Sequence, residues 1–511
     1  MTIYSFSPFG YEGALVTVEV DLRRGIPAID MVGLADGAVR ESRERMRVAV
    51  QNSGFDFPLE RILISLSPAD VRKEGAGFDL PIALAVLAAS LEEQIPENRT
   101  VLVMGELELS GKVRPVRGVH AAVVSALEQG IHRCIVPAAN AAEAKIQNMR
   151  VCSAETLSAA FEGLIAPFDS SLESPQETVS VSPEETKVVE FPEVSPALEF
   201  AEIKRQDSLV RALQIAAAGA HNLLAYGPPG CGKTLALSRF PALLPLLDDA
   251  EARPVTRIYS LAGDLPQGQP LMRIPPFRTP HQSSSLEGMI GGGKNCSPGE
   301  VSLAHNGVLF LDEAAEFKTH VLQSLRVPLE SGFVTVSRAG RKSEYPAAFQ
   351  LIAASNPCPC GNFGVRGKIC LCSARSVEQY WTRFSAPLLD RIDIRIPVFP
   401  QDDSDPSNSG TTGQLREAIG RAVGIQRRRQ QKRNRFLLPE EIRKYCVTDN
   451  EADQTLSDAA MEYGFSARGV ASCLKLGRTI ADMAGRTKIN KEDIKEAVSL
   501  RKNEGGLSYN F

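Results

Sequence analysis

The sequence predicts an α/β protein in which a larger domain, built on a parallel sheet and ending in helices, follows a smaller α+β domain. Three observations support this prediction. A glycine-rich loop at 227–234 stands between an apolar run and a helix-forming segment. A second apolar run, at 307–311, ends in an acidic pair, and an acidic, proline-punctuated stretch at 166–199 separates both features from the first 165 residues. Apolar runs that alternate with helical segments are typical of parallel sheets.

Length and composition indicate a globular protein of about three domains. The 511 residues include 57 Lys and Arg and 61 Asp and Glu, a net charge of −4, so any contact with nucleic acid must come from local cationic patches. The first residues lack a basic segment followed by a long apolar core, and the most apolar run, 80–91, is too short to span a bilayer. Ten cysteines, six of them scattered, suit a reducing compartment. We therefore expect a cytoplasmic protein without membrane contact.

Residues 1–165 alternate strand-like and helix-like stretches, which predicts an α+β domain with its own core. Strands are expected at 14–22, 62–67 and 101–109, a helix at 36–53 and a hairpin return at 111–116. The expected helix contains Arg40, Arg43, Arg45 and Arg47. Such a run suits either a solvated helix face or contact with DNA phosphates.

A linker is predicted at 166–199, where five prolines are interleaved with serine, threonine and glutamate and Lys187 is the only cation. Acidic, proline-rich segments of this kind stay extended and do not form a core. The linker marks the clearest domain boundary of the chain, and the larger domain is expected at 200–400.

The glycine-rich loop fits the pattern G-x-x-x-x-G-K-[ST], in which backbone N–H groups and the start of a helix bind phosphate. It consists of Gly227, Pro228, Pro229, Gly230, Cys231, Gly232, Lys233 and Thr234. Lys233 is expected to reach the β- and γ-phosphates of ATP, and Thr234 to ligate Mg²⁺. A helix expected at 203–213 would flank the adenine. The alternative, a structural glycine turn, is disfavoured by the residues downstream.

Polar residues end two further apolar strands, expected at 307–311 and 349–355. Asp312 and Glu313 end the first: Asp312 would organise Mg²⁺ and its waters, and Glu313 would orient or deprotonate the attacking water. Asn356 ends the second, where it could sense the γ-phosphate or hold that water. These residues predict an ATPase with ATP and Mg²⁺ as its ligands.

Arg391 is a candidate arginine finger, offered to ATP that is held by a neighbouring subunit. Its planar, permanent charge suits stabilisation of a transferring phosphoryl group. Arg383 is the second candidate. Either arginine could instead belong to an ordinary ion pair.

Cationic residues gather in two segments. A hairpin is predicted at 332–345, and Arg338, Arg341 and Lys342 crowd its tip. This hairpin suits either a solvated turn or a basic finger that grips a polyanion in a central channel. The segment 254–298 is rich in glycine and proline and is expected to be irregular, with a mobile loop that ends at Lys294.

Four cysteines fall within fifteen residues: Cys358, Cys360, Cys370 and Cys372. Four thiolates can form a tetrahedral zinc site. The spacing here is Cys-x-Cys twice, tighter than the usual Cys-x₂-Cys. Zinc, reduced thiols and a redox pair are the alternatives.

The C-terminal part is expected to be helical at 414–511, after a flexible polar loop at 401–413. Its first helix, at 414–435, carries eight arginines and lysines and suits either a solvated helix end or a second cationic surface for nucleic acid. Short amphipathic helices are expected at 438–505, the last of them capped by Asn490. Arg468 begins one of these helices, where a second phosphate-sensing arginine would sit.

Together the sequence motifs described above resemble those of the magnesium-chelatase-like AAA+ family that includes YifB and ComM. The resemblance rests on 227–234, 276–281 with 291–293, 298–313, 355–361 and 387–391, and on the order of the domains. It implies an AAA+ ATPase core with a helical lid, and a homo-oligomeric ring, a hexamer, with ATP between subunits. It also implies that Asn356 is sensor one, Arg391 the finger and Arg468 sensor two, and that the basic hairpin and the loop 291–294 face a pore.

Within the first domain, 72–84 and 105–116 resemble the ribosomal-S5-like fold shared with the Lon protease domain. The positions of the Lon serine and lysine fall near Gly77 and His120, and neither residue can do that chemistry. We therefore expect a proteolytically inactive scaffold domain.

The leading hypothesis is a DNA-dependent ATPase that translocates on, or migrates, branched or single-stranded DNA as a helicase in recombination or DNA uptake. The alternative is a chelatase motor that drives Mg²⁺ into a porphyrin with partner subunits. The S5-like domain argues against it, because chelatase motor subunits typically lack one. A third hypothesis, an ATP-gated scaffold without turnover, is disfavoured by the intact acidic pair and by Arg391.

Overall fold

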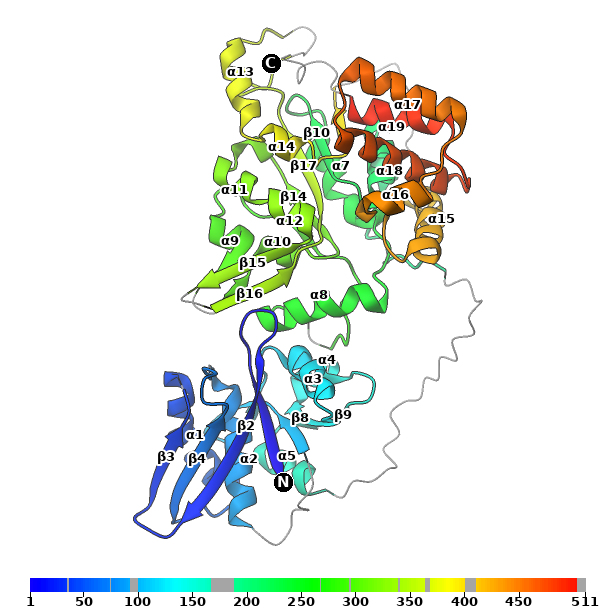
Figure 1. Cartoon of the computed structure of the whole chain (residues 1–511). Helices are drawn as coiled ribbons and strands as arrows, with labels where there is room; N and C mark the ends of the chain where they lie inside the picture. Colours follow the sequence, from blue (N-terminus) through cyan, green and yellow to red (C-terminus); the bar gives the residue numbers. More distant parts are fainter. Residues whose placement is uncertain are drawn as a thin grey trace.

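A computed structural model of the chain describes residues 1–34, 36–73, 75–91, 100–166, 188–266, 268–293, 296–338, 341–363, 368–399 and 410–502. Most of the predicted linker and of the predicted loop at 401–413 lie outside these ranges. Within them the chain forms a mixed α/β structure with two large sheets and a C-terminal group of helices (Figure 1). None of the described helices is long and apolar enough to cross a membrane.

The first sheet has seven strands in the order β3-β4-β2-β1-β5-β8-β9. β2 is antiparallel to both of its neighbours, and the other neighbouring pairs are parallel. Its strands are β1 Thr2–Ser7, β2 Ala14–Arg23, β3 Ala28–Val32, β4 Arg61–Ser67, β5 Thr100–Val103, β8 Arg133–Pro137 and β9 Arg150–Ala154. One face is covered by α1 Gly37–Asn52, α2 Asp79–Ser90 and α5 Leu157–Ile165, and the other by α3 Val119–Glu128 and α4 Ala141–Ala144.

Local patterns predicted some of these elements, among them β2, β4 and α1. The helix expected at 36–53 is α1, and the Asp36 side chain caps it by accepting a hydrogen bond from the Val39 N–H. The single strand expected at 101–109 is wrong, because β5 ends at Val103 and the chain continues into the hairpin β6 Glu106–Leu107 and β7 Val113–Arg114. The backbone of Gly105 bonds outside the sheet: its N–H donates to the Gly77 carbonyl at 3.2 Å, and its carbonyl accepts a hydrogen bond from the Leu80 N–H at 3.0 Å.

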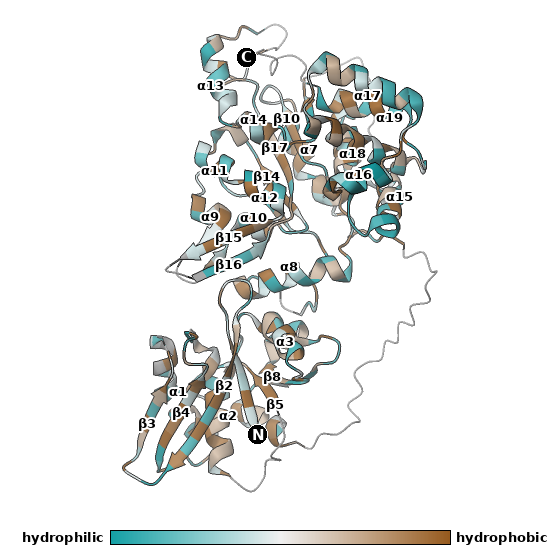
Figure 2. Ribbon diagram, in the orientation of Figure 1, coloured by the Kyte–Doolittle hydropathy of each residue, from teal (hydrophilic) through white to brown (hydrophobic). Residues whose placement is uncertain are grey.

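The second sheet is parallel throughout and has the order β11-β14-β17-β10-β18. Its strands are β10 Leu223–Tyr226, β11 Phe277–Arg278, β14 Val308–Leu311, β17 Gln350–Ser355 and β18 Ile394–Pro397. Successive residues of β10 face opposite cores, Leu223 on one side and Leu224 on the other. A sheet buried on both faces needs nearly continuous apolar strands, and its inner strands are accordingly mostly hydrophobic (Figure 2), with Gln350 and Ser355 at the two ends of β17 as buried polar exceptions.

Helices surround this sheet, and one of them corrects a prediction. The bounds are α6 Asp207–Gly219, α7 Lys233–Ser238, α8 Asp249–Ala262, α9 Leu286–Ile290, α10 Glu300–Leu303, α11 Thr319–Ser324, α12 Arg326–Ser331, α13 Ala374–Thr382 and α14 Ala386–Leu389. The expectation of an irregular segment from residue 254 is wrong, because Pro254 lies inside α8. A capping box between Asp248 and Glu251 starts this helix upstream of the proline.

The C-terminal part is helical, as predicted. Its helices are α15 Thr412–Gln430, α16 Pro439–Tyr445, α17 Asn450–Tyr463, α18 Ala467–Met483 and α19 Lys491–Arg501. α15 ends five residues before the predicted end at 435. Asn490 caps α19 as predicted, in a capping box with Asp493.

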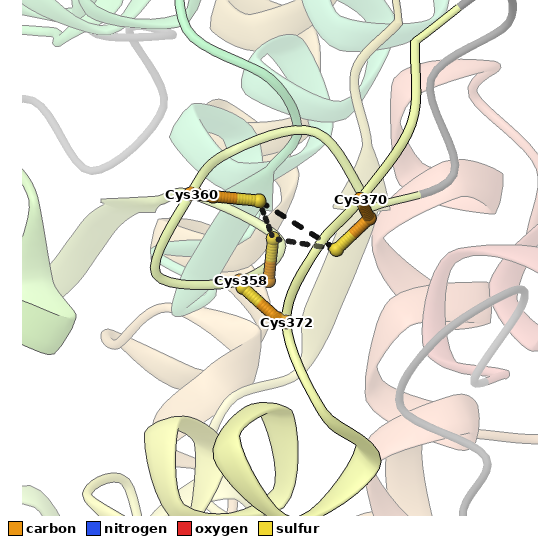
Figure 3. Close-up of side chains that lie close together, drawn as sticks. All are labelled: Cys358, Cys360, Cys370 and Cys372. Carbon is orange, nitrogen blue, oxygen red and sulfur yellow. Dashed lines mark hydrogen bonds between the residues drawn. The ribbon is translucent and has the colours of Figure 1, made fainter.

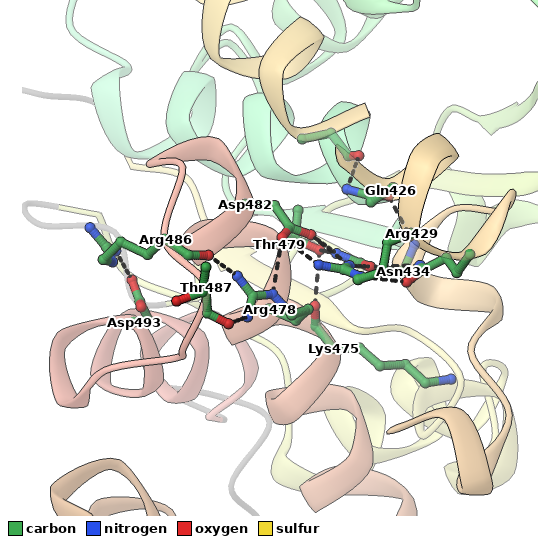
Figure 4. Close-up of polar contacts among 12 residues, drawn as sticks. Gln426, Arg429, Asn434, Lys475, Arg478, Thr479, Asp482, Arg486, Thr487 and Asp493 are labelled. Carbon is green, nitrogen blue, oxygen red and sulfur yellow. Dashed lines mark hydrogen bonds and ion pairs between the residues drawn. The ribbon is translucent and has the colours of Figure 1, made fainter. Parts of the chain in front are cut away.

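The cations on and just after α15 mostly bind within the chain. Arg416 donates to the Ala242 carbonyl at 2.6 Å, and Arg433 donates to the Ala217 carbonyl at 2.7 Å. Arg429 and Arg478 both donate to the buried carboxylate of Asp482 (Figure 4). These cations join the C-terminal helices to one another and to the second sheet, so we do not retain the interpretation of this run as a surface for nucleic acid.

Candidate nucleotide-binding site

Three strand ends bring the predicted catalytic residues together. β14, β17 and β10 are neighbours and parallel, so Asp312, Asn356 and Gly227 follow them at the same edge of the sheet. The register pairs Tyr226 with Ser355, and the Gly227 N–H donates to the Ser355 carbonyl at 3.2 Å. The phosphate loop therefore starts beside Asn356.

The phosphate loop leads directly into α7, as predicted. Gly230 and Gly232 have φ values of 80° and 82°, a left-handed conformation that glycine adopts without strain. The Lys233 ammonium donates to the carbonyls of Gly227 at 2.6 Å and Pro228 at 2.8 Å. The loop thus buries its cation at the start of a helix, where anions bind favourably.

The acidic pair lies next to this loop. The Thr234 hydroxyl donates to Asp312 at 3.2 Å, so the two predicted Mg²⁺ ligands are adjacent. Hydroxyl and carboxylate oxygens are the ligands that Mg²⁺ prefers. Glu313 follows with a φ of 48°, an uncommon conformation for a residue other than glycine. Its carboxylate accepts a hydrogen bond from the Gln282 side chain at 2.6 Å.

Gln282 is a site residue that sequence reasoning missed. It lies in the segment expected to be irregular, and its only signal is that it directly follows the string 276–281 used for the resemblance. Because it holds the exposed Glu313 carboxylate, it is a positioning residue for the predicted water-activating group.

Arg391 lies at the other ends of the strands, opposite the phosphate loop. It precedes β18, which is parallel to β10 with Ile394 beside Leu223, and its carbonyl accepts a hydrogen bond from Asn222 at 2.8 Å. Asn222 comes just before β10, whereas the phosphate loop comes just after it. The length of a strand therefore separates Arg391 from the phosphate loop of its own subunit.

Arg468 lies beside Arg391. Both guanidinium groups donate to Glu330 of α12, Arg468 at 2.6 Å. These hydrogen bonds lower the pKa of the Glu330 carboxyl below its usual value. Two predicted phosphate-sensing arginines thus share one anion of their own chain.

Arg383, the second finger candidate, is held locally. Its guanidinium lies 3.6 Å from the Glu316 carboxylate and donates to the Ala315 carbonyl. It therefore has the ordinary ion pair that the sequence left open as its alternative.

The predicted basic hairpin is present as β15 Phe333–Arg338 and β16 Arg341–Pro346, with Arg338 opposite Arg341. Lys342 is exposed. The side chains of Arg338 and Arg341, the tip at 339–340 and Lys294 lie outside the described residues.

The first domain contacts the base of this hairpin through the turn between β1 and β2 (Figure 1). The Tyr11 N–H donates to the Ser343 hydroxyl at 2.9 Å, and the Tyr11 and Tyr345 rings meet edge to face with centroids 5.8 Å apart. Arg257 of α8 lies 4.7 Å from the centre of the Tyr11 ring. This contact joins the first sheet and its helices to the candidate DNA-binding element, and no local sequence pattern indicates it.

His120, which the sequence comparison placed near the expected position of the Lon lysine, is buried where α3 meets α8. Its backbone N–H donates to the Ser260 hydroxyl at 3.2 Å, and Ser260 donates to the Glu143 carboxylate at 2.6 Å. Burial lowers the pKa of His120 to about 4 and raises the pKa of Glu143. This geometry gives His120 a packing role between the two domains.

The four cysteines converge within one loop (Figure 3). All four are free thiols, and Cys358 is the buried member of the group. The cluster adjoins the nucleotide site, because Cys358 lies two residues after Asn356.

Comparison with known proteins covers nearly the whole chain. Residues 199–405 match the family model described as magnesium chelatase, subunit ChlI, residues 18–140 match subunit ChlI of Mg-chelatase, and residues 409–501 match the ChlI C-terminal model. An uncharacterized protein YifB from Salmonella typhimurium is 39% identical over 508 residues, which cover 98% of this chain and 96% of its own length.

Two further relatives differ in coverage. The competence protein ComM from Haemophilus influenzae is 38% identical over 510 residues, 98% of this chain and 97% of its own length. The magnesium-chelatase 38 kDa subunit from Cereibacter sphaeroides is 27% identical over 174 residues, 31% of this chain and 52% of its own length. With full-length similarity of this degree and an AAA+-like nucleotide site on a parallel sheet, the chain belongs to the magnesium-chelatase-like YifB/ComM family.

Proposed function

We propose that this protein hydrolyses ATP and uses the energy to move or branch-migrate DNA as a ring of identical subunits. The observation that carries the ATPase is the convergence of Lys233, Thr234 and the acidic pair at one sheet edge. Lys233 would exchange the carbonyls of its own loop for phosphate oxygens. Glu313, oriented by Gln282, would take the proton of the water that attacks the γ-phosphorus as ADP leaves.

Mg²⁺ would be held by Thr234 and Asp312 and would neutralise charge on the phosphates. Zinc is a candidate for the four-cysteine cluster and has no part in the hydrolysis step. Ten free thiols support a cytoplasmic location, because such proteins keep their cysteines reduced.

The opposite placement of the phosphate loop and Arg391 supports the ring. A subunit with its loop at one edge and its arginine at the other completes an ATP site only against a second copy, in a head-to-tail contact. We propose that Arg391 and Arg468 complete the site of the neighbour, and that the ring is a hexamer as in the family the sequence resembles.

The basic hairpin supports the DNA substrate. Its sequence places Arg338, Arg341 and Lys342 around the tip, and cations of this kind grip nucleic-acid phosphates. The name of the relative from Haemophilus influenzae links that protein to competence, and we propose a role of this chain in DNA uptake or recombination.

The test measures ATP hydrolysis by the full-length protein alone, with single-stranded DNA and with forked DNA. We expect stimulation that is strongest with forked DNA and absent in Glu313→Gln. Lys342→Glu should reduce the stimulation and leave the basal rate unchanged. Hydrolysis that no DNA stimulates would refute the DNA substrate, and no hydrolysis under any condition would refute the ATPase.

A chelatase motor is the second candidate, favoured by the partial match to the 38 kDa subunit of magnesium chelatase. It would drive Mg²⁺ into a porphyrin together with partner subunits. Co-purification with a porphyrin-binding protein would support it, and DNA-stimulated hydrolysis would not be expected of it.

A further inference from the structure

The cysteine cluster has the geometry of a closed four-sulfur site (Figure 3). The Cys358 sulfur lies 3.4 Å from that of Cys360 and 3.7 Å from that of Cys370, and the sulfurs of Cys360 and Cys370 are 3.6 Å apart. With Cys372 included, all four sulfurs lie within 4.8 Å of one another. Tetrahedral bonds of about 2.3 Å to one zinc ion place sulfurs about 3.8 Å apart. A disulfide would need about 2.05 Å.

The loop that carries these cysteines has little else to hold it. Its described residues, 356–363 and 368–373, contain no helix or strand. Ile369 and Leu371 are 81% and 89% exposed, so they contribute nothing to a core. Cys358 belongs to the core of the second sheet, and Phe363, Cys370 and Cys372 pack against that core, so the cysteines themselves make most of the contacts of the loop with it. A segment with so little core needs a cross-link, and a metal ion supplies one.

The loop also lies directly against the phosphate loop. Gly361 has a φ of 77°, and a Cβ built on it would lie 2.7 Å from the Pro229 ring. On the other side, the Trp381 indole N–H donates to the Pro357 carbonyl at 3.1 Å. The turn held by the cysteines therefore connects Asn356 to the phosphate loop.

We propose that Cys358, Cys360, Cys370 and Cys372 bind one zinc ion per subunit. Four thiolates in a closed tetrahedron select zinc or iron over Mg²⁺, and they leave no position for water. The ion is therefore structural: it fixes the turn that packs on Pro229 and orders the nucleotide site without touching ATP. The zinc content is independent of the proposed function, whereas its effect on nucleotide binding rests on the proposed ATP site.

Elemental analysis of the full-length protein, purified without an affinity tag that binds metal, tests the site. We expect about one zinc per chain, and less than about a tenth of that in Cys360→Ser/Cys372→Ser. Cys152→Ser changes a part-exposed free cysteine outside the cluster and should keep the zinc. Iron in place of zinc, or no metal, would overturn the proposal. We also expect ten titratable thiols in the denatured, metal-free protein. Finding only six would overturn the proposal, because the missing four would be joined in two disulfides.

A second measurement uses the wild-type chain, since the double variant may fail to fold. Cobalt exchanged into the site should give the thiolate charge-transfer and visible absorption of a tetrahedral four-sulfur site, and a spectrum typical of six-coordinate cobalt would contradict the geometry.

The effect on the nucleotide site is measured with a fluorescent ADP analogue. Zinc-free protein that keeps its far-UV circular dichroism should bind at least about tenfold more weakly, and zinc should restore the binding. Equal binding with and without zinc would refute the ordering of the phosphate loop. If the zinc content and the nucleotide binding are as expected but no DNA stimulates ATP hydrolysis, the zinc site stands and the proposed DNA substrate is refuted.

Discussion

Arg468 donates to the Glu330 carboxylate at 2.6 Å, and Arg391 donates to the other oxygen of the same group. Both arginines lie at the sheet edge away from the phosphate loop of their own chain. A carboxylate of the subunit thus occupies the two side chains that we expect to meet the phosphates of a neighbour.

Mixed subunits should restore activity that neither variant has alone. Lys233→Ala and Arg391→Ala should each lower ATP turnover by at least about a hundredfold, because one removes phosphate binding and the other removes the arginine. In an equal mixture, about a quarter of the interfaces join an intact loop to an intact arginine, so turnover should recover to about a quarter of the wild-type value.

The matched control mixes Lys233→Ala with Glu313→Gln, which damage the same side of the interface. A coupled assay of ADP release should show no recovery for this pair. Recovery here, or its absence in the first mixture, would show that Arg391 does not act across the interface.

Glu330→Gln should change binding more than stability. Glu330 is 53% exposed, and exposed ion pairs contribute no more than about 1 kcal/mol to folding. With the competing carboxylate removed, Arg391 and Arg468 become free to meet phosphate, so KM for ATP should fall several-fold. Turnover as a function of ATP concentration measures this, and an unchanged or raised KM would refute competition by Glu330.

Gln282→Leu should lower kcat by roughly tenfold to a hundredfold, since a misplaced Glu313 no longer orients the water. The Kd for ATP should stay the same, because the Gln282 side chain binds the Glu313 carboxylate, which acts on the water. Ser283→Ala, a change at the adjacent exposed position, serves as the control. Weaker ATP binding with unchanged kcat would assign Gln282 to the binding step instead.

Asp482→Ala should destabilise the C-terminal helices by about 3–5 kcal/mol, because it leaves the buried guanidinium of Arg478 without its anionic partner. Arg478 is 1% exposed and Asp482 is fully buried. Denaturant unfolding followed by circular dichroism measures the loss. Asp458→Ala, on the exposed face of α17, should cost less than about 0.5 kcal/mol. A similar loss of unfolding free energy in both variants would show that the ion pairs of Asp482 do not stabilise the C-terminal helices in particular.

His120 should make the contact between the two domains sensitive to acid. Its pKa is about 4 in the folded protein and about 6.5 in an unfolded chain. The unfolded state therefore binds the proton first, and the stabilisation present above pH 6.5 is lost as the pH falls towards 4. At pH 5 the loss should be about 2 kcal/mol relative to pH 7.5.

His120→Gln should reduce the difference in unfolding free energy between pH 7.5 and pH 5 by about 2 kcal/mol. His132→Gln, at an exposed histidine, should leave it unchanged. An equal pH dependence in wild type and His120→Gln would show that acid acts elsewhere.

Local patterns predicted the parts of the site that are contiguous in sequence. The strand before Gly227, the helix from Lys233 and the strand before Asp312 all follow from short runs of residues, and the parallel sheet brings their ends together. Pro254 misled the prediction because a proline usually ends a helix, whereas here capping and burial start the helix upstream of it.

Long-range partners could not be predicted. Glu330 binds arginines that are 61 and 138 residues away, and Tyr11 meets Ser343 over 332 residues. Such contacts depend on how whole elements pack, and neither Glu330 nor Gln282 belongs to a motif that would mark it in the sequence.

If the proposed ring opened into an arc, the arc would have one complete nucleotide site fewer than it has subunits. In that assembly the phosphate loop of each subunit would meet Arg391 of the next subunit, so the phosphate loop at the end of the arc would face solvent. Opening the ring to admit a DNA junction would stop ATP hydrolysis at that end site. Closure of the ring around the junction would complete the site and allow hydrolysis again. The geometry of the ring alone would then couple the loading of DNA to the hydrolysis of ATP.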